Sequence, residues 1–221
     1  QPSENLKQRG IGWTSERKPT TQGTDIFLPS TLEVYDNKAD NFSCLKVYAT
    51  HQAGHLEFGS FVFRFDAEGL LFPRLRGDVE VFQGKKGASI TDIERFLDLF
   101  ALRRLATDIF TLAEDTRVDG FTHREYGGIR SFLRRVQRDA RARRTLLTTL
   151  PLRSAVLEAL LQQSLDPSRP VPLPQAYHSH FVVAWGFLSR LRERVCTVED
   201  VAETALRIYI VLRAIPNLQA Q

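Results

Sequence analysis

The chain has 221 residues, of which 43% are hydrophobic and 25% are charged, with a formal net charge of +4. This is the composition of an ordinary globular protein, and no apolar run approaches the roughly 20 residues that span a bilayer, which argues against a membrane protein. The polar N-terminal residues predict no signal peptide, and two distant cysteines, Cys44 and Cys196, form no metal motif and favour a reducing, cytoplasmic location.

We predict a mainly α-helical, multi-helix fold with a small N-terminal β element. Residues 1–24 are polar and are expected to form an arm, and residues 25–221 are expected to form a helical domain. Short β-favourable runs at residues 25–28 and 31–35 supply the β element. The stretch near residues 69–90 is rich in glycine and contains a proline, so it is the candidate for a boundary inside this domain.

Helical periodicity and capping signals place the helices that follow. Asn41 or Ser43 is the predicted cap of the first helix, and Thr91 with Glu94 forms a capping box at the start of the longest one. A basic amphipathic helix follows a glycine pair, and a proline begins the helix after it. The predicted helices lie at about residues 45–59, 91–120, 129–143, 151–165, 175–194 and 197–215.

A pair of histidines four residues apart is the most informative local pattern. On a helix, His51 and His55 face the same side, as do the two zinc ligands of an H-E-x-x-H protease helix. The position of the catalytic glutamate is occupied by Gln52, whose neutral amide cannot take a proton from a metal-bound water. The segment therefore keeps the ligand spacing of such a protease, a degenerate gluzincin-like scaffold, without its general base.

A metal site would need a third ligand, and Glu114 has the order and separation expected of a gluzincin. It belongs to a charged run, residues 114–119, at the end of an otherwise apolar helix, where charges must be paired or metal-bound. We therefore predict that His51, His55 and Glu114 lie together. A metal-free polar cluster is favoured, no cofactor is expected, and zinc is the alternative.

Eight arginines fall within residues 124–144, and a cluster of this kind can be a solvated helix face or a partner surface. No aromatic residue is interleaved between Arg134 and Arg144, which disfavours binding of single-stranded nucleic acid. Guanidinium groups bind carboxylates through paired hydrogen bonds, so an acidic protein is the expected partner. Arg134, Arg138 and Arg141 are the predicted contact residues.

Three segments carry a family resemblance. They are residues 49–61 (Ala-Thr-His-Gln-Ala-Gly-His-Leu-Glu-Phe-Gly-Ser-Phe), residues 112–119 (Leu-Ala-Glu-Asp-Thr-Arg-Val-Asp), and residues 205–209 (Ala-Leu-Arg-Ile-Tyr) followed by Ile-Pro-Asn at 215–217. Together they resemble the CbbO/NorD family, and residues 51–59 resemble the CbbO branch most. Members of this family carry a von Willebrand factor A domain near the C-terminus and work with hexameric MoxR-type AAA+ ATPases, CbbQ in the case of CbbO.

The resemblance implies the non-catalytic adaptor portion of a Rubisco activase, in which the ATPase supplies force. The metal motif of a von Willebrand factor A domain, Asp-x-Ser-x-Ser, is absent, so this chain is expected to precede that domain, through which Rubisco would be contacted. Three rivals stay open. They are a NorD-like activator of nitric oxide reductase, a gluzincin-like metallohydrolase with Glu57 or Glu114 as base, and a nucleic-acid-binding module built on the arginine helix.

Overall fold

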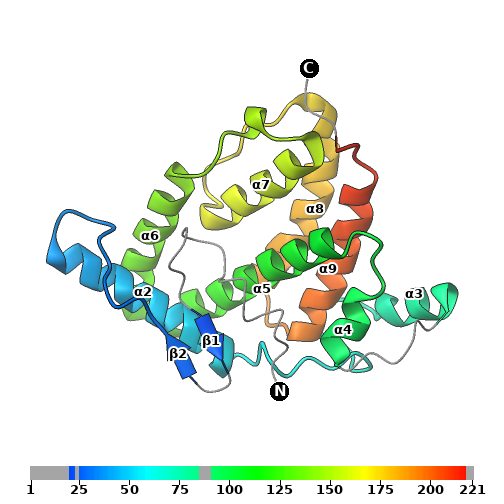
Figure 1. The fold of residues 1–221 in the computed structure, drawn as a ribbon, viewed down its shortest axis with the longest axis horizontal. Coiled ribbons are helices and arrows are strands. Elements are labelled where there is room, and N and C mark those ends of the chain that lie inside the picture. Colours follow the sequence, from blue (N-terminus) through cyan, green and yellow to red (C-terminus); the bar gives the residue numbers. More distant parts are fainter. Residues whose placement is uncertain (1–19, 23–24, 85–90, 218–221) are drawn as a thin grey trace.

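The computed structural model describes residues 20–22, 25–84 and 91–217, and within these the fold is mainly α-helical, as predicted (Figure 1). The predicted arm, residues 1–24, lies outside the described residues except for 20–22. The elements are β1 (Thr20–Gln22), β2 (Asp25–Phe27), α2 (Lys38–Glu57), α3 (Leu75–Gln83), α4 (Asp92–Leu97), α5 (Arg103–Glu125), α6 (Arg130–Ala142), α7 (Leu152–Leu165), α8 (Gln175–Glu193) and α9 (Val198–Arg213), with 3₁₀ turns at Gly127–Ile129 and Leu147–Thr149.

The β element is a short antiparallel pair, β1 with β2, in which Thr21 lies opposite Ile26. The second β-favourable run, residues 31–35, is not a strand, and that part of the prediction is wrong. The reason is local: the Asn41 side chain accepts hydrogen bonds from the backbone N–H groups of Val34 and Tyr35, at 2.9 and 2.8 Å, and donates to the Tyr35 carbonyl. This side chain occupies backbone groups that a neighbouring strand would need.

Helix α2 begins at Lys38, seven residues before its predicted start at Leu45. Its cap is Asn37, whose side-chain oxygen accepts the N–H of Asp40 at 2.8 Å. A polar first turn concealed the start, because the periodic apolar positions by which a helix is recognised appear only later in this helix. The early start matters, since it gives α2 the length to pack against two other helices.

The predicted helix 91–120 is two helices, α4 and α5, with a break at residues 98–102. The capping box that opens it is present, formed by Thr91 and Glu94. At the break, the Leu102 N–H donates to the Tyr209 hydroxyl at 3.0 Å, and the Phe100 ring packs edge-on against Tyr209. A contact with α9, distant in sequence, thus replaces the helical hydrogen bond, and no local pattern could have predicted it.

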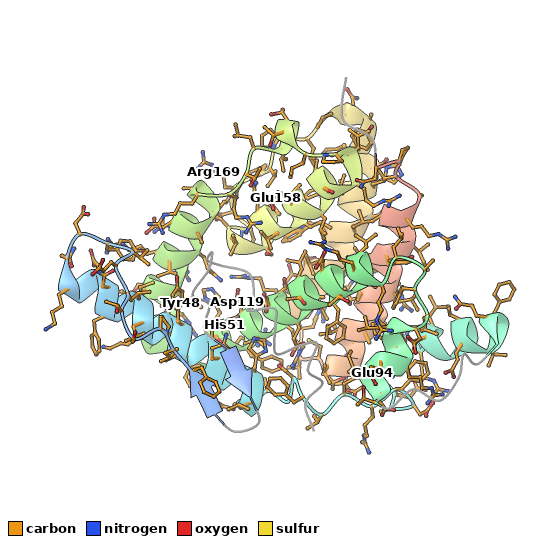
Figure 2. The ribbon with its side chains drawn as sticks, viewed as in Figure 1. Tyr48, His51, Glu94, Asp119, Glu158 and Arg169 are labelled. Atoms are coloured by element: carbon orange, nitrogen blue, oxygen red, sulfur yellow. The ribbon has the colours of Figure 1, made fainter. Side chains whose placement is uncertain are left out.

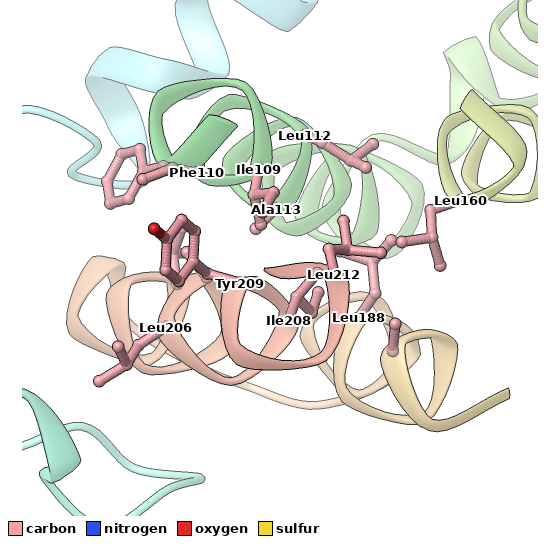
Figure 3. Close-up of a cluster of buried hydrophobic side chains, with 14 of the residues drawn as sticks. Ile109, Phe110, Leu112, Ala113, Leu160, Leu188, Leu206, Ile208, Tyr209 and Leu212 are labelled. Carbon is pink, nitrogen blue, oxygen red and sulfur yellow. The ribbon is translucent and has the colours of Figure 1, made fainter. Parts of the chain in front are cut away.

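Helix α5 crosses the middle of the molecule and packs against α2, α8 and α9 (Figure 1). The main apolar core lies where α5, α8 and α9 meet, with α4 and α7 at its edges (Figure 3). Gly120 permits the approach of α5 to α8, because a Cβ there would lie 2.6 Å from the carbonyl oxygen of Arg192. Fully or largely buried side chains of this core include Ile109, Phe110, Leu112, Ala113, Leu160, Leu188, Ile208, Tyr209 and Leu212.

A second, smaller apolar cluster joins α2 to α6. It is separate from the main core, and the polar side chains of α2 and α5 described below lie between the two. Its buried members are Cys44, Val47, Tyr48, Leu133 and Val136. Burial raises the pKa of the Cys44 thiol, so this cysteine is a structural apolar residue rather than a nucleophile.

The first turns of α9 hold the segment before α3. The Asp200 carboxylate, fully buried, accepts the backbone N–H groups of Leu70 and Leu71, at 2.9 and 2.7 Å, and that of Thr197 at 2.9 Å. Gly69 is required there, because a Cβ would lie 2.3 Å from an Asp200 oxygen. The stretch suggested as an internal boundary, residues 69–90, is therefore bound to α9 in its first part, while residues 85–90 lie outside the described residues.

The side chains of Arg76 and Glu203 form a fully buried ion pair at 2.8 Å, which joins α3 to α9. The remaining Arg76 donors bind carbonyl oxygens of Phe65 and Ala67, and Glu203 accepts the N–H of Leu75 at the start of α3. A buried guanidinium that is paired with a carboxylate and hydrogen-bonded to carbonyl oxygens is tolerated, whereas one without its counter-charge is strongly destabilising.

We expect Glu203→Gln to lower the free energy of unfolding by about 3–5 kcal/mol, because it leaves the Arg76 charge buried and uncompensated. Urea unfolding followed by circular dichroism measures this. The matched control is Arg103→Ala, which removes the half-exposed Arg103–Asp98 pair and should cost only about 0–1 kcal/mol. Equal losses in the two variants would contradict the importance assigned to the buried pair.

Candidate functional site

The site lies where α2 crosses α5. The side chains of His51 and His55 lie on the same face of α2, as their spacing predicts. This face is directed toward α5, and both side chains are buried. Gly54, between them, makes the close approach possible, since a Cβ at this position would lie 2.9 Å from the Cγ1 atom of Val118 on α5. The glycine in the His-Gln-Ala-Gly-His segment is thus a packing requirement of the site.

The two imidazoles meet edge to face, with ring centroids 4.9 Å apart and an interplanar angle of 82°. Their Nε2 atoms are 3.2 Å apart. The Oδ1 atom of Asp115, on α5, lies 3.7 Å from each Nε2 and has no hydrogen-bond partner among the described residues. The three atoms form a small triangle of candidate metal ligands.

A carboxylate on α5 orients the His51 ring. The Nδ1 atom of His51 lies 3.1 Å from Oδ1 of Asp119, and the other oxygen of Asp119 accepts a hydrogen bond from the Gln137 amide of α6 at 2.7 Å. Figure 2 shows His51 and Asp119 near the centre of the molecule, between α2 and α5. Asp119 accepts the Nδ1 proton of His51, which fixes the direction of the ring.

A hydroxyl orients the other ring. Nδ1 of His55 lies 2.8 Å from the Ser60 hydroxyl oxygen, and that hydroxyl donates its proton to Glu114. Glu114 is in turn held by the Arg117 guanidinium through two hydrogen bonds of 2.8 and 2.5 Å. Arg117 also donates to the carbonyl of Phe58, at the end of α2, at 3.0 Å.

The predicted third ligand, Glu114, is near the histidines but does not face them. The position is taken by its neighbour Asp115, because Glu114 is bound to Arg117 and Ser60 and stands one layer behind His55. A signal for this was present in the sequence: Asp115 and Asp119 are four residues apart, like His51 and His55. Two such pairs on packed helices face one another, which the gluzincin order obscured.

Burial and neighbouring charges divide the site into a charged and a neutral imidazole. Burial lowers the pKa of His51, but the Asp115 and Asp119 carboxylates outweigh it and raise that pKa to about 10. The pKa of His55 falls well below its ordinary value, because the ring is buried and lies against His51. Burial raises the pKa of Asp115 to about 7.

The site is closed to solvent. The exposed fractions are 6% for His51, 1% for His55 and 6% for Asp115, and Gln52, at the position of the protease base, is 3% exposed. Glu57, the other base considered, points away and bonds the Tyr126 hydroxyl. The arrangement can hold a proton or an ion, but it offers neither an open face for a substrate nor a free general base.

Most of the clustered arginines have structural partners. Arg135 forms two hydrogen bonds with Asp40, at 2.7 and 2.8 Å, and so joins α6 to α2, while Arg144 holds Glu158. Carbonyl oxygens of the same chain bind four others, Arg124, Arg130, Arg141 and Arg143. These six arginines therefore form contacts within the fold, which is neither a purely solvated face nor a partner surface.

Of the three predicted contact residues, Arg134 and Arg138 are exposed, one turn apart on α6, and form no hydrogen bond or ion pair within the described residues. Arg141 differs, because its guanidinium donates to the carbonyls of Asp166 and Arg169, at 2.9 and 2.7 Å, and so anchors the chain after α7. The partner contact of these three residues stays a prediction, and Arg134 and Arg138 are the two whose side chains have no such role within the fold.

No protein-family model matches this chain, and comparisons with curated proteins and with solved structures gave no significant match. Within the described residues, no helix has both the length and the hydropathy that crossing a membrane requires. The family resemblance thus rests on the three sequence segments quoted above.

We expect Gly54→Ala to destabilise the fold by about 1–3 kcal/mol, because the added methyl group meets the stiff, β-branched Val118 side chain and pushes α2 away from α5. Thermal unfolding measures the change. Gly186→Ala is the matched control: it also lies inside a helix, but its added Cβ meets nothing within 4 Å, so it should stabilise by up to about 1 kcal/mol. A neutral Gly54→Ala variant would contradict the close approach.

Proposed function

We propose that this chain is a non-catalytic adaptor portion of a Rubisco activase, which links a hexameric MoxR-type AAA+ ATPase of the CbbQ kind to a Rubisco-binding domain outside the chain. The role is the one implied by the resemblance to the CbbO/NorD family. It would place the protein in the cytoplasm, with Rubisco as the complex that the ATPase remodels.

The closed histidine site carries the non-catalytic part of the proposal. The residues with the best potential for chemistry, His51, His55 and Asp115, are all buried, and Gln52 stands where a protease has its base. Enzymes need a concave, accessible site whose groups can reach a substrate. A group of side chains enclosed between α2 and α5 is suited to holding the helices together, not to turnover.

Two exposed features on opposite sides of the molecule support an adaptor, which must contact two bodies. One is the pair Arg134 and Arg138 on α6. The other is the end of α3, where Val81 is 83% exposed and Phe82 is 91% exposed. Figure 1 shows α6 and α3 at opposite sides of the view. Helix α3 is anchored at its other end by the buried Arg76–Glu203 pair, so these apolar side chains project from a fixed base.

The charge of α6 selects the kind of partner. Arginines without an intramolecular counter-charge attract carboxylates over long distances and then bind them through paired hydrogen bonds. We therefore expect the Arg134–Arg138 surface to contact an acidic patch of the ATPase ring, with an affinity that falls as salt rises. Nucleic acid is disfavoured, since no exposed aromatic stacking residue lies between the two arginines.

The direct test is binding of the purified chain to the MoxR-type ATPase of the same organism, by surface plasmon resonance at 50 and 300 mM salt. We expect Arg134→Glu with Arg138→Glu to weaken binding at least about tenfold, since a close like-charge contact replaces an attractive one. Rubisco reactivation by the full-length protein with its ATPase should fall in parallel.

The control variant is Arg104→Glu with Arg213→Glu, which changes the net charge equally at exposed positions away from α6 and should bind normally. Equal binding by the two double variants would remove α6 from the interface. If the wild-type chain binds no ATPase ring, the adaptor proposal fails. If the full-length protein with its ATPase activates nitric oxide reductase and not Rubisco, the NorD-like rival is favoured.

A further inference from the structure

We propose that His51, His55 and Asp115 bind one divalent metal ion, zinc, as a structural centre that joins α2 to α5. The ligand atoms would be the two Nε2 nitrogens and the Oδ1 oxygen, which already face a common point. The inference concerns the stability of this fold and does not depend on the proposed adaptor function.

Counting hydrogen-bond donors shows which protons the two rings carry. Asp119 is acceptor-only, so the proton between it and His51 is on Nδ1 of the imidazole. The Ser60 hydroxyl gives its single proton to Glu114, so it must accept the Nδ1 proton of His55. In its neutral form each ring would therefore have its bare nitrogen at Nε2, and the two Nε2 atoms lie 3.2 Å apart.

A proton does not complete the site. The second proton of the charged His51 ring would be donated from its Nε2 to His55, which satisfies the two rings. It would still leave Oδ1 of Asp115, which is buried and has no hydrogen-bond partner, without a donor. Such an oxygen is costly to bury, whereas a cation at the centre of the triangle satisfies all three atoms at once.

The dimensions of the triangle fit zinc. Its sides are 3.2, 3.7 and 3.7 Å. A point equidistant from the three atoms lies about 2.1 Å from each, which is the zinc–ligand distance for imidazole nitrogen and carboxylate oxygen. Two imidazoles with one carboxylate also favour zinc over magnesium or calcium, which prefer ligand sets made of oxygen alone. The fourth position would be left to a water or to the second Asp115 oxygen.

The groups behind the ligands have the arrangement of a metal site. His51 is backed by Asp119, and His55 is backed by the Ser60 hydroxyl, so each ring presents Nε2 toward the centre. The charges also match. Glu114 is neutralised by Arg117, which leaves two buried carboxylates, Asp115 and Asp119, beside the proposed divalent ion. Arg192 of α8 interacts electrostatically with Asp119, and its guanidinium donates a hydrogen bond to the Ser164 carbonyl.

The place of the centre in the fold explains what the metal would do. The α2–α6 apolar cluster is separate from the main core, and the histidine site lies between them. An ion bound by two α2 side chains and one α5 side chain would fasten the smaller unit to the larger. Metal binding that occurs only in the folded state adds directly to its stability.

The test is a titration of the wild-type chain, stripped with a chelator, with zinc chloride alone. We expect close to one equivalent bound with a dissociation constant below 1 μM, and a rise in the unfolding midpoint when zinc is restored. Cobalt(II) in place of zinc should give the visible absorption of a four-coordinate site. Elemental analysis of the untreated protein identifies the resident metal.

His55→Ala and Asp115→Asn should lose the tight equivalent, and Asp119→Asn, which removes only the support behind His51, should weaken zinc binding about 10–100-fold. The matched control is His178→Ala, an exposed histidine on α8, which should bind as wild type does. The proposal is overturned if the folded, stripped wild type binds no zinc below 10 μM. It is equally overturned if His178→Ala loses as much zinc as His55→Ala. Where a ligand variant does not fold, the zinc titration of the wild type alone decides whether the proposal stands.

Discussion

The structure depends on one constraint: helix α5 carries a charged turn through the interior. Residues 114–119 are all buried, and three of them are carboxylates. Because an unpaired charge in the interior is very costly, each needs a partner from α5 itself or from a neighbouring element. Arg117 meets Glu114 within the helix, α6 supplies Gln137, and α2 supplies both histidines. The position of α2 and of the turn that follows it is therefore set by polar groups of α5.

The buried interior consists of two apolar clusters with a layer of polar side chains between them. The main core would hold α5, α8 and α9 together without help, and the α2–α6 cluster is internally complete but small. What joins them is the layer of histidines and carboxylates, reinforced at the rim by the Arg135–Asp40 pair. Buried polar contacts are more directional than apolar ones, so this layer fixes how the smaller unit sits on the larger. Such a directional attachment suits the proposed adaptor role, and the proposed metal would strengthen it.

Acidic residues of α9 likewise hold a neighbouring segment in place, here the segment that leads into α3. Asp200 and Glu203 bind backbone N–H groups of the segment that leads into α3, and Glu203 also balances Arg76. The stretch of residues 69–90 was suggested as a boundary because its sequence shows no regular pattern, but it contains helix α3. In its first part, backbone N–H groups donate to carboxylates about 130 residues away in the sequence, and no local segment of the sequence contains both partners.

The sequence by itself determined the fold class from helical periodicity along the whole chain. It also determined the capping box at Thr91 and the fact that His51 and His55 share a helix face, because these depend on residues within one or two turns. Only the tertiary structure decided which carboxylate faces the histidines, where the helix after Thr91 breaks, and which arginines are free of structural duty. Those outcomes depend on contacts between α2, α5, α6 and α9. Successive side chains on a helix point about 100° apart, so moving one position along the helix changes which neighbouring element a side chain meets. Composition and spacing cannot distinguish the neighbours Glu114 and Asp115. The packing of α5 against α2 makes Asp115 a candidate ligand, whereas Glu114 supports His55 through the Ser60 hydroxyl.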